Sequence, residues 1–96
     1  MLNQSITIQQ DRILISGELT FATVEDILKQ SQKIFPKQGQ WNCDLSQVTT
    51  CDSAGIALLL EWLKWAGQRQ IKLCFFQLPN QLQAIIAAAG LDKLFV

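Results

Sequence analysis

Hydrophobic residues recur along this chain with two different spacings. Near the start, the apolar and β-branched runs Ile6–Ile8 and Ile13–Ile15 are separated by four polar residues, 9–12. Two such runs around a short polar connection predict a hairpin of two strands, which should close near Gly17. Asp11 is a typical turn residue for the connection.

A helical spacing follows the hairpin. Thr23 precedes Asp26 by three residues, which is similar to a capping box with Thr23 as the N-cap. Apolar residues then recur at helical intervals until Pro36, which cannot continue a helix. After a loop containing Gly39, residues Trp41–Leu45 predict a third strand.

The two spacings alternate again in the second half. A long apolar segment predicts a helix over Ser53–Arg69, and Ile71–Phe76 predicts a fourth strand. A third helix is expected over Asn80–Ala89, because Pro79 suits its first turn and Gly90 suits its end. The apolar residues of the tail are expected to fold back onto the core: Leu91, Leu94 and Phe95.

The resulting order is β-β-α-β-α-β-α. Strands that alternate with helices favour a parallel sheet, to which the opening hairpin adds an antiparallel member. The fold class is therefore expected to be α/β, with a mixed, mostly parallel sheet of about four strands and three or four helices. A length of 96 residues suffices for one domain and hardly for two, so residues 1–96 are expected to form a single domain.

Composition and charge limit the classes of function that this chain is expected to have. Hydrophobic residues make up 49% of the chain and charged residues 17%, with eight basic and eight acidic side chains. No Lys or Arg cluster indicates binding to nucleic acid. The N-terminus lacks the features of a signal peptide, and the apolar run Ile56–Leu60 is far shorter than the ~20 residues of a spanning helix. We therefore expect a cytoplasmic protein without direct membrane insertion.

The residue types needed for catalysis are sparse. The chain has no histidine, so it holds no Ser-His or Cys-His pair, and it has no glycine-rich phosphate loop. Cys43, Cys51 and Cys74 show no metal-binding spacing and are expected to be reduced, small apolar residues without disulfides. The prediction is a protein that is not an enzyme and that needs no metal and no cofactor.

One segment, Asp44–Gly55, combines polar and small residues at the start of a strongly apolar helix. Either Asp52 or Ser53 is expected to be the N-cap of that helix. One interpretation is an ordinary cap. The other is a charge-sensitive docking point, because free N–H groups and the helix dipole attract anions while the small Ala54 and Gly55 allow close approach. A phosphate on Ser53 would add about 1.5–2 negative charges there.

The helix that follows carries apolar residues on two faces. At about 100° per residue, the face toward the sheet should hold Ile56, Leu59, Leu60, Leu63 and Gly67. The face roughly opposite holds Leu58, Glu61 and Trp65, with Trp62 on its flank. Either the two indoles pack partly under the first or third helix, or they form a partner surface, where tryptophan is enriched.

Three stretches of the sequence together resemble the STAS domain family. They are Gly17-Glu18-Leu19-Thr20, Asp44-Leu45-Ser46 with Val48 and Asp52-Ser53-Ala54-Gly55, and Gly90-Leu91-Asp92-Lys93-Leu94-Phe95. The resemblance spans nearly the whole chain and implies that residues 1–96 are one STAS domain.

Two roles follow from this resemblance. Anti-anti-sigma factors carry, at the position matching Ser53, a serine that a partner anti-sigma kinase phosphorylates. The STAS subunit of the Mla phospholipid-transporting ABC complex instead sits on the cytoplasmic ATPase subunit, with a Ser or Thr of that position in the contact. The apolar outer face favours a permanent subunit, because obligate interfaces are more hydrophobic.

We therefore expect a subunit that supports assembly or regulation of an ABC ATPase. The transporter would maintain outer-membrane lipid asymmetry, and the subunit would lie on the cytoplasmic side of the inner membrane through that complex. The expected docking surface comprises Asp52, Ser53, Ala54, Gly55, Leu58, Trp62 and Trp65.

Overall fold

A β hairpin opens the fold. The computed structural model describes residues 5–95, so the start of the chain, where no signal peptide is predicted, and residue 96 of the tail lie outside the described part. Strand β1 (Ser5–Gln9) pairs antiparallel with β2 (Arg12–Leu19), and Ile8 lies opposite Ile13. Gln10, with a φ of 56°, and Asp11 form the turn, as predicted for Asp11.

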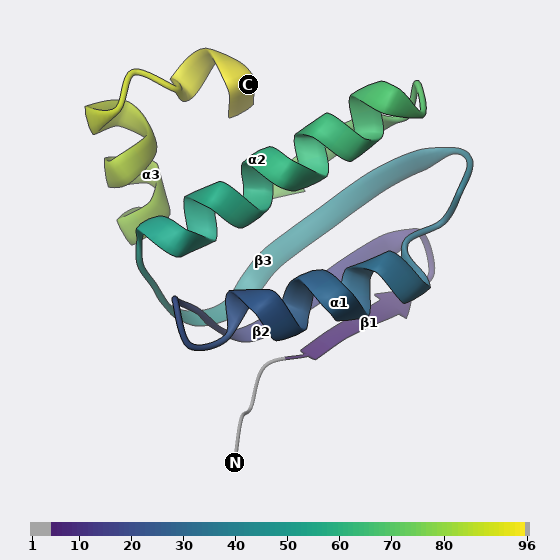
Figure 1. Ribbon diagram of the computed structural model, residues 1–96, viewed down its shortest axis with the longest axis horizontal. Helices are drawn as coiled ribbons and strands as arrows, with labels where there is room; N and C mark the ends of the chain where they lie inside the picture. The colour runs from purple at the N-terminus through teal and green to yellow at the C-terminus, as the bar shows by residue number, and fades with distance from the viewer. Residues whose placement is uncertain (1–4, 96) are drawn as a thin grey trace.

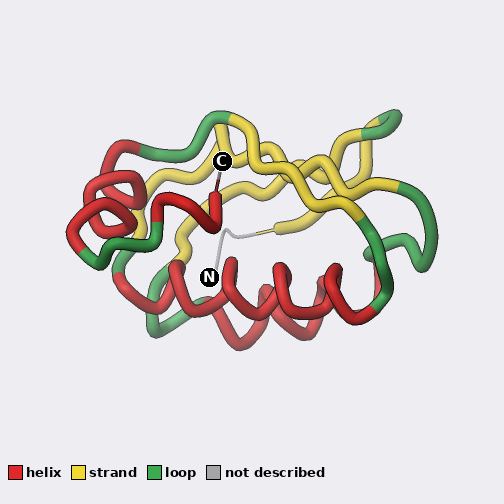
Figure 2. The backbone as a smooth tube through the Cα atoms, turned by 90° about the horizontal axis from the view of Figure 1, so that it is seen from above, coloured by secondary structure: helices red, strands yellow, loops and turns green. Residues whose placement is uncertain are grey.

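The sheet has the strand order β1-β2-β3-β4, and β3 (Gln40–Cys51) runs parallel to both β2 and β4 (Lys72–Phe76). Helices α1 (Val24–Ile34) and α2 (Ser53–Gln68) lie side by side on one face of the sheet (Figures 1 and 2). Helix α3 (Asn80–Ala88) packs against α2 and β3, and a short 3₁₀ helix, η1 (Asp92–Phe95), follows. The predicted fold class and element order are confirmed.

Aromatic rings fill the core where α1 ends and β3 begins. The ring of Phe35 lies with its centroid 4.9 Å from that of Trp41 and 5.0 Å from that of Trp62. Each buried indole N–H has an acceptor: Trp41 donates to the Pro36 carbonyl at 2.8 Å, and Trp62 donates to Ser31 Oγ at 3.0 Å. Satisfying these N–H groups avoids the free-energy cost of burying an unpaired donor.

Two local predictions are wrong. The third strand, predicted over Trp41–Leu45, continues as β3 to Cys51, because parallel pairing with β2 satisfies its backbone through an irregular register that ends at Leu19 and Cys51. The capping box is not formed, since Thr23 makes no side-chain cap to α1. Its hydroxyl instead donates to the Glu18 carbonyl at 2.7 Å and accepts from the backbone N–H of Thr20 at 3.0 Å.

The tail folds back only in part. Phe95 packs on Phe75 of β4 with a centroid separation of 5.4 Å, and Leu91 packs against the core. Leu94, which was predicted to do the same, is 53% exposed because the 3₁₀ turn directs it away from the core. Between residues 5 and 95, none of the helices combines the length and the apolar character that crossing a membrane requires.

Candidate functional site

Asp52 organises the start of α2. It is the N-cap, and its Oδ1 accepts the backbone N–H of Ala54 at 2.8 Å. Its Oδ2 accepts the backbone N–H of Phe21 at 3.2 Å, and its own N–H donates to the Leu19 carbonyl at 3.1 Å. One side chain therefore joins the α2 start to the loop between β2 and α1. Of the two predicted caps, Asp52 is the one that the structure uses.

The first amide groups of α2 are already paired. The Ala54 N–H is bound by the Asp52 carboxylate, and the Gly55 N–H donates to the Asp52 carbonyl at 2.9 Å. The predicted attraction of an anion by free N–H groups is therefore wrong at these two positions, because the cap residue has taken both donors.

Ser53 is exposed at the first position of α2. Its hydroxyl makes no hydrogen bond to any residue between 5 and 95. A hydroxyl in this situation is open to a partner protein or to a modifying enzyme, because no internal bond has to break first.

A mostly apolar groove of about 470 Å³ lies between the N-terminal parts of α1 and α2, beside Ser53. Its walls are small or apolar, with two carboxylates among them. We call it the Ser53 groove; the lining residues are Phe21, Val24, Glu25, Leu28, Ser53, Ala54, Ala57, Leu58 and Glu61. Apolar walls with a few polar groups are typical of binding sites.

Phe21 lines the groove but was not among the residues predicted for the docking surface. Its ring is 80% exposed, although the Asp52 carboxylate holds its backbone in place. An exposed ring on a fixed loop loses little conformational entropy on binding, so it is suited to be an interface anchor. The available signal was a lone aromatic residue in the turn between Leu19 and Thr23, where no helix or strand would bury it.

The structure contradicts part of the expected docking surface. Trp62 is fully buried, and Leu58 is 3% exposed and reaches only the wall of the groove, because α1 lies over the face of α2 that was expected to meet solvent. The alternative, that an indole packs under the first helix, holds for Trp62, whose N–H reaches Ser31 of α1. A partner surface cannot include a ring that the chain's own helices cover.

Gly55 also has an internal role. A Cβ at this position would lie 3.1 Å from the Leu19 carbonyl oxygen and 3.4 Å from Leu82 Cδ2. The close approach that glycine allows is therefore to the end of β2 and to α3, and the expectation that it serves a partner is wrong. Ala54 is buried but lines the groove, so it stays part of the candidate site.

Trp65 is half-buried and lies three turns away from Ser53, outside the groove. The buried face of α2 is rotated about the helix axis relative to the face predicted from a spacing of about 100° per residue. Gly67 is exposed and Leu63 is only half-buried, whereas Ala66 is buried. The physical reason is that α2 packs against α1 and α3 as well as the sheet.

Two of the cysteines are shielded, and one of them, Cys51, directly precedes the N-cap of α2. Burial raises the pKa of the Cys51 thiol, and the neighbouring Asp52 carboxylate raises it further, although a backbone N–H of Leu82 acts in the opposite direction. Burial likewise raises the pKa of the Cys43 thiol. Both thiols therefore remain protonated and unreactive near neutral pH. Within the described chain, no group of three His, Cys, Asp or Glu residues is arranged to hold a metal ion.

Asp44, the first residue of the segment Asp44–Gly55, does not line the groove. Its Oδ1 accepts the backbone N–H of Ser46 at 2.9 Å, and Arg12 lies 3.4 Å from Oδ2. Hydrogen bonds from the Ser46 backbone and hydroxyl, followed by the Arg12 charge, lower the pKa of this carboxyl group. Asp44 thus serves the local geometry of β3, and only the second half of the segment forms the site.

Comparison with known proteins agrees with this architecture. Residues 2–96 match the model of a family described as "Mlab, STAS domain". A candidate anti-sigma factor antagonist from Thermotoga maritima is similar in structure, with a TM-score of 0.74 and 15% identity over 96% of this chain and 82% of that one. The anti-sigma factor antagonist SpoIIAA in its unphosphorylated form gives 0.65 and 15%, over 96% and 97%.

A sulfate transporter family protein from Wolinella succinogenes gives a TM-score of 0.68 and 18% identity, over 94% of this chain and 75% of that one. At these identities the likeness to solved structures concerns the fold. A search of the curated proteins finds no match.

Proposed function

Because this chain belongs to the STAS domain family, we propose that it is a non-catalytic subunit that binds the ATPase of an ABC transporter through the Ser53 groove. In this role it supports assembly or regulation of phospholipid transport that maintains outer-membrane lipid asymmetry. It would lie in the cytoplasm, at the inner membrane, through that complex. The family description, which names Mlab, supports this proposal, and STAS domains are generally regulatory or binding domains.

The exposed Phe21 ring beside the Ser53 groove is the observation on which the proposal depends. A large aromatic ring exposed to water gains free energy when a partner covers it. Asp52 fixes the loop through its bond to the Phe21 N–H, so the ring is presented in one place. A fixed aromatic anchor next to an apolar groove is the arrangement expected of an interface hot spot.

The carboxylates of the groove add selectivity. Glu25 is exposed at the rim, where its Oε1 lies 3.8 Å from Lys29 Nζ, and Glu61 is half-buried on the facing helix. A partner with Lys or Arg around an apolar contact would be attracted, and an acidic partner would be repelled. Rim charges of this kind act mainly on the association rate and on the choice of partner.

A second candidate function is that of an anti-anti-sigma factor switched by phosphorylation of Ser53. The free and exposed Ser53 hydroxyl favours it, as do the two structural neighbours described as anti-sigma factor antagonists. A phosphate at Ser53 would stand beside the Asp52 carboxylate, and the N–H groups of Ala54 and Gly55 are already bound to Asp52. The added charge would change which partner the groove accepts.

Affinity purification with matched variants tests the proposal. Tagged wild-type chain, Phe21→Ala and Leu94→Ala would be expressed in native cells, and co-eluting proteins identified by mass spectrometry. Leu94 is the control because it is also an exposed apolar residue but lies in the tail. We expect an ABC ATPase with the wild type and Leu94→Ala, and at least tenfold less with Phe21→Ala, since an anchor of this kind contributes about 2 kcal/mol.

The outcomes separate the two functions. Co-elution of an anti-sigma kinase in place of an ATPase would support the second function. An ATPase that binds wild type and Phe21→Ala equally would contradict docking at the Ser53 groove.

A further inference from the structure

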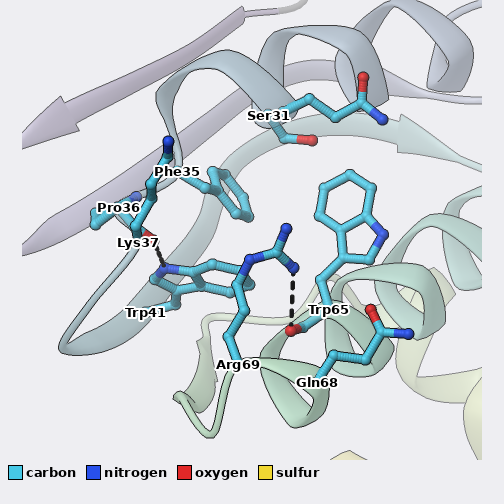
Figure 3. Close-up of a pocket in the computed structure, with 9 residues that line it drawn as sticks. Ser31, Phe35, Pro36, Lys37, Trp41, Trp65, Gln68 and Arg69 are labelled. Atoms are coloured by element: carbon cyan, nitrogen blue, oxygen red, sulfur yellow. Dashed lines mark hydrogen bonds between the residues drawn. The ribbon is translucent and has the colours of Figure 1, made fainter.

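A second hollow, of about 500 Å³, lies at the opposite ends of α1 and α2 (Figure 3). It collects residues from the end of α1, the following loop, the start of β3 and the last turns of α2. We call it the Trp65 pocket; its lining residues are Ser31, Gln32, Phe35, Pro36, Lys37, Trp41, Trp65, Gln68 and Arg69.

Aromatic rings form the walls of this pocket. Trp41 and Phe35 are buried and in edge-to-face contact, so their positions are set by the core. Trp65 is half-buried and stands across from them in Figure 3. The Trp41 N–H is bound to the Pro36 carbonyl and the ring is buried, so Trp41 forms the rigid base of the pocket, and Trp65 carries the accessible aromatic surface. Flat rings on rigid supports are suited to pack against a planar ligand.

The charges of the pocket have one sign. Lys37 and Arg69 line it, and no Asp or Glu is found among the described residues that do so. Figure 3 shows the Arg69 side chain passing in front of Trp41, with its guanidinium group directed toward Trp65. The amide groups of Gln32 and Gln68 add neutral donors and acceptors.

Both cations have N–H donors that no hydrogen bond within residues 5–95 uses. Arg69 donates one N–H to the Trp65 carbonyl at 3.2 Å, an ordinary contact at a helix C-terminus. Its guanidinium group has further N–H groups to offer. Lys37 comes after Pro36, beyond the end of α1, and its ammonium group makes no hydrogen bond or ion pair within residues 5–95.

We propose that the Trp65 pocket binds a small planar anion, that is, an aromatic ring that carries one acidic group. The ring would lie against Trp65, and the acidic group would meet Lys37 and Arg69. A volume of about 500 Å³ falls in the range of pockets that hold small molecules. This site is separate from the Ser53 groove and does not depend on the proposed function.

Two probes of nearly equal shape test the charge requirement. The full chain, labelled with nitrogen-15, is titrated with 2-naphthoate and, in parallel, with the neutral 2-naphthamide, and amide and indole N–H signals are followed by NMR. We expect saturable binding of 2-naphthoate and at least tenfold weaker binding of 2-naphthamide. The Trp65 and Trp41 indole signals should shift, whereas the backbone amide signals of Phe21 and Ser53, which line the other hollow, should stay in place.

Charge-removing variants locate the acidic group. Lys37→Gln and Arg69→Gln should each weaken 2-naphthoate binding at least threefold, and Trp65→Leu should weaken both probes. Lys93→Gln removes the same charge from the exposed tail and should leave the affinity unchanged within a factor of two. Unchanged amide spectra of the variants outside the pocket would show that they fold normally.

Three results would overturn the proposal. They are no saturable binding of 2-naphthoate, equal binding of the two probes, and shifts centred on Phe21 and Ser53 in place of the pocket. The Phe21→Ala variant should bind 2-naphthoate as the wild type does, so that failure of the Trp65 pocket and failure of the Ser53 groove are distinguishable.

Discussion

The Ser53 groove and the Trp65 pocket lie at opposite ends of the same pair of helices, and their chemistry is opposite. The groove is apolar with the carboxylates Glu25 and Glu61, whereas the pocket is aromatic with the cations Lys37 and Arg69. The two helices run in the same direction because each connects parallel strands of one sheet (Figure 1). Their positive dipole ends therefore lie together, as do their negative ends.

This arrangement explains part of the separation of charge. Acidic side chains are favoured at helix N-termini and basic ones at C-termini. Glu25 and Asp26 lie in the first turn of α1, Lys33 lies in its last turn, and Arg69 caps α2. The general lesson is that parallel helices on a sheet gather acidic side chains at one end and basic side chains at the other, and these side chains then set the charge preference of each end.

The largest expected effect is a loss of stability from the core that supports both the groove and the pocket. Trp62 lies in the core beneath α1, so Trp62→Ala should lower the free energy of unfolding by about 3–5 kcal/mol. Trp65→Ala removes the same side chain from a half-buried site and should cost less than about 2 kcal/mol. Urea unfolding followed by circular dichroism measures both. A loss of 3 kcal/mol or more for Trp65→Ala would place that ring in the core and not in a pocket wall.

Ser53 variants would sharpen the charge preference of the groove. Ser53→Glu should weaken partner binding about five- to tenfold, equivalent to about 1–1.4 kcal/mol, because a third carboxylate joins Glu25 and Glu61. Ser53→Ala keeps the size nearly constant without the charge and should have a smaller effect. Binding of the purified partner is measured by calorimetry. Equal affinity of all three forms would argue that Ser53 is not in the contact.

Removing the cap would test whether the groove depends on Asp52. Asp52→Ala should reduce the free energy of unfolding by about 1 kcal/mol, the usual cost of losing an N-cap. It should also weaken partner binding, because the Phe21 loop loses its anchor, while 2-naphthoate binding at the other end should be unaffected. Parallel unfolding and titration experiments check this. Unchanged partner binding would show that the loop holds Phe21 without Asp52.

The smallest expected effect concerns pH and a residue outside both regions. The pKa of Asp44 is lowered in the folded state, so its contribution to stability is complete above its unfolded pKa and is lost as the pH falls through the folded value. Asp44→Asn should therefore cost about 0.5 kcal/mol or less at pH 7 and still less at pH 2. Urea unfolding at the two pH values measures the difference. A larger cost at pH 2 than at pH 7 would contradict the lowered pKa.

Much of the fold was predictable from local patterns. The alternation of apolar spacings predicts the order of strands and helices, and the Asp-Ser-Ala-Gly sequence predicts the start of α2 with Ser53 at its surface. These features depend on neighbours within a few residues, such as the bond between Asp52 and Ala54. Local hydrogen bonding and side-chain periodicity are present in the sequence itself.

Tertiary packing decided the rest. A helical wheel assumes one buried face, but α2 is covered by the sheet, α1 and α3, so Leu58 and Trp62 became core residues. The Trp65 pocket joins Ser31 to Arg69, which are 38 positions apart by their numbers, and no periodicity links them. The sequence by itself determined which segments become helices and strands, because that choice is local. Which side chains meet in a site depends on how those segments pack in three dimensions.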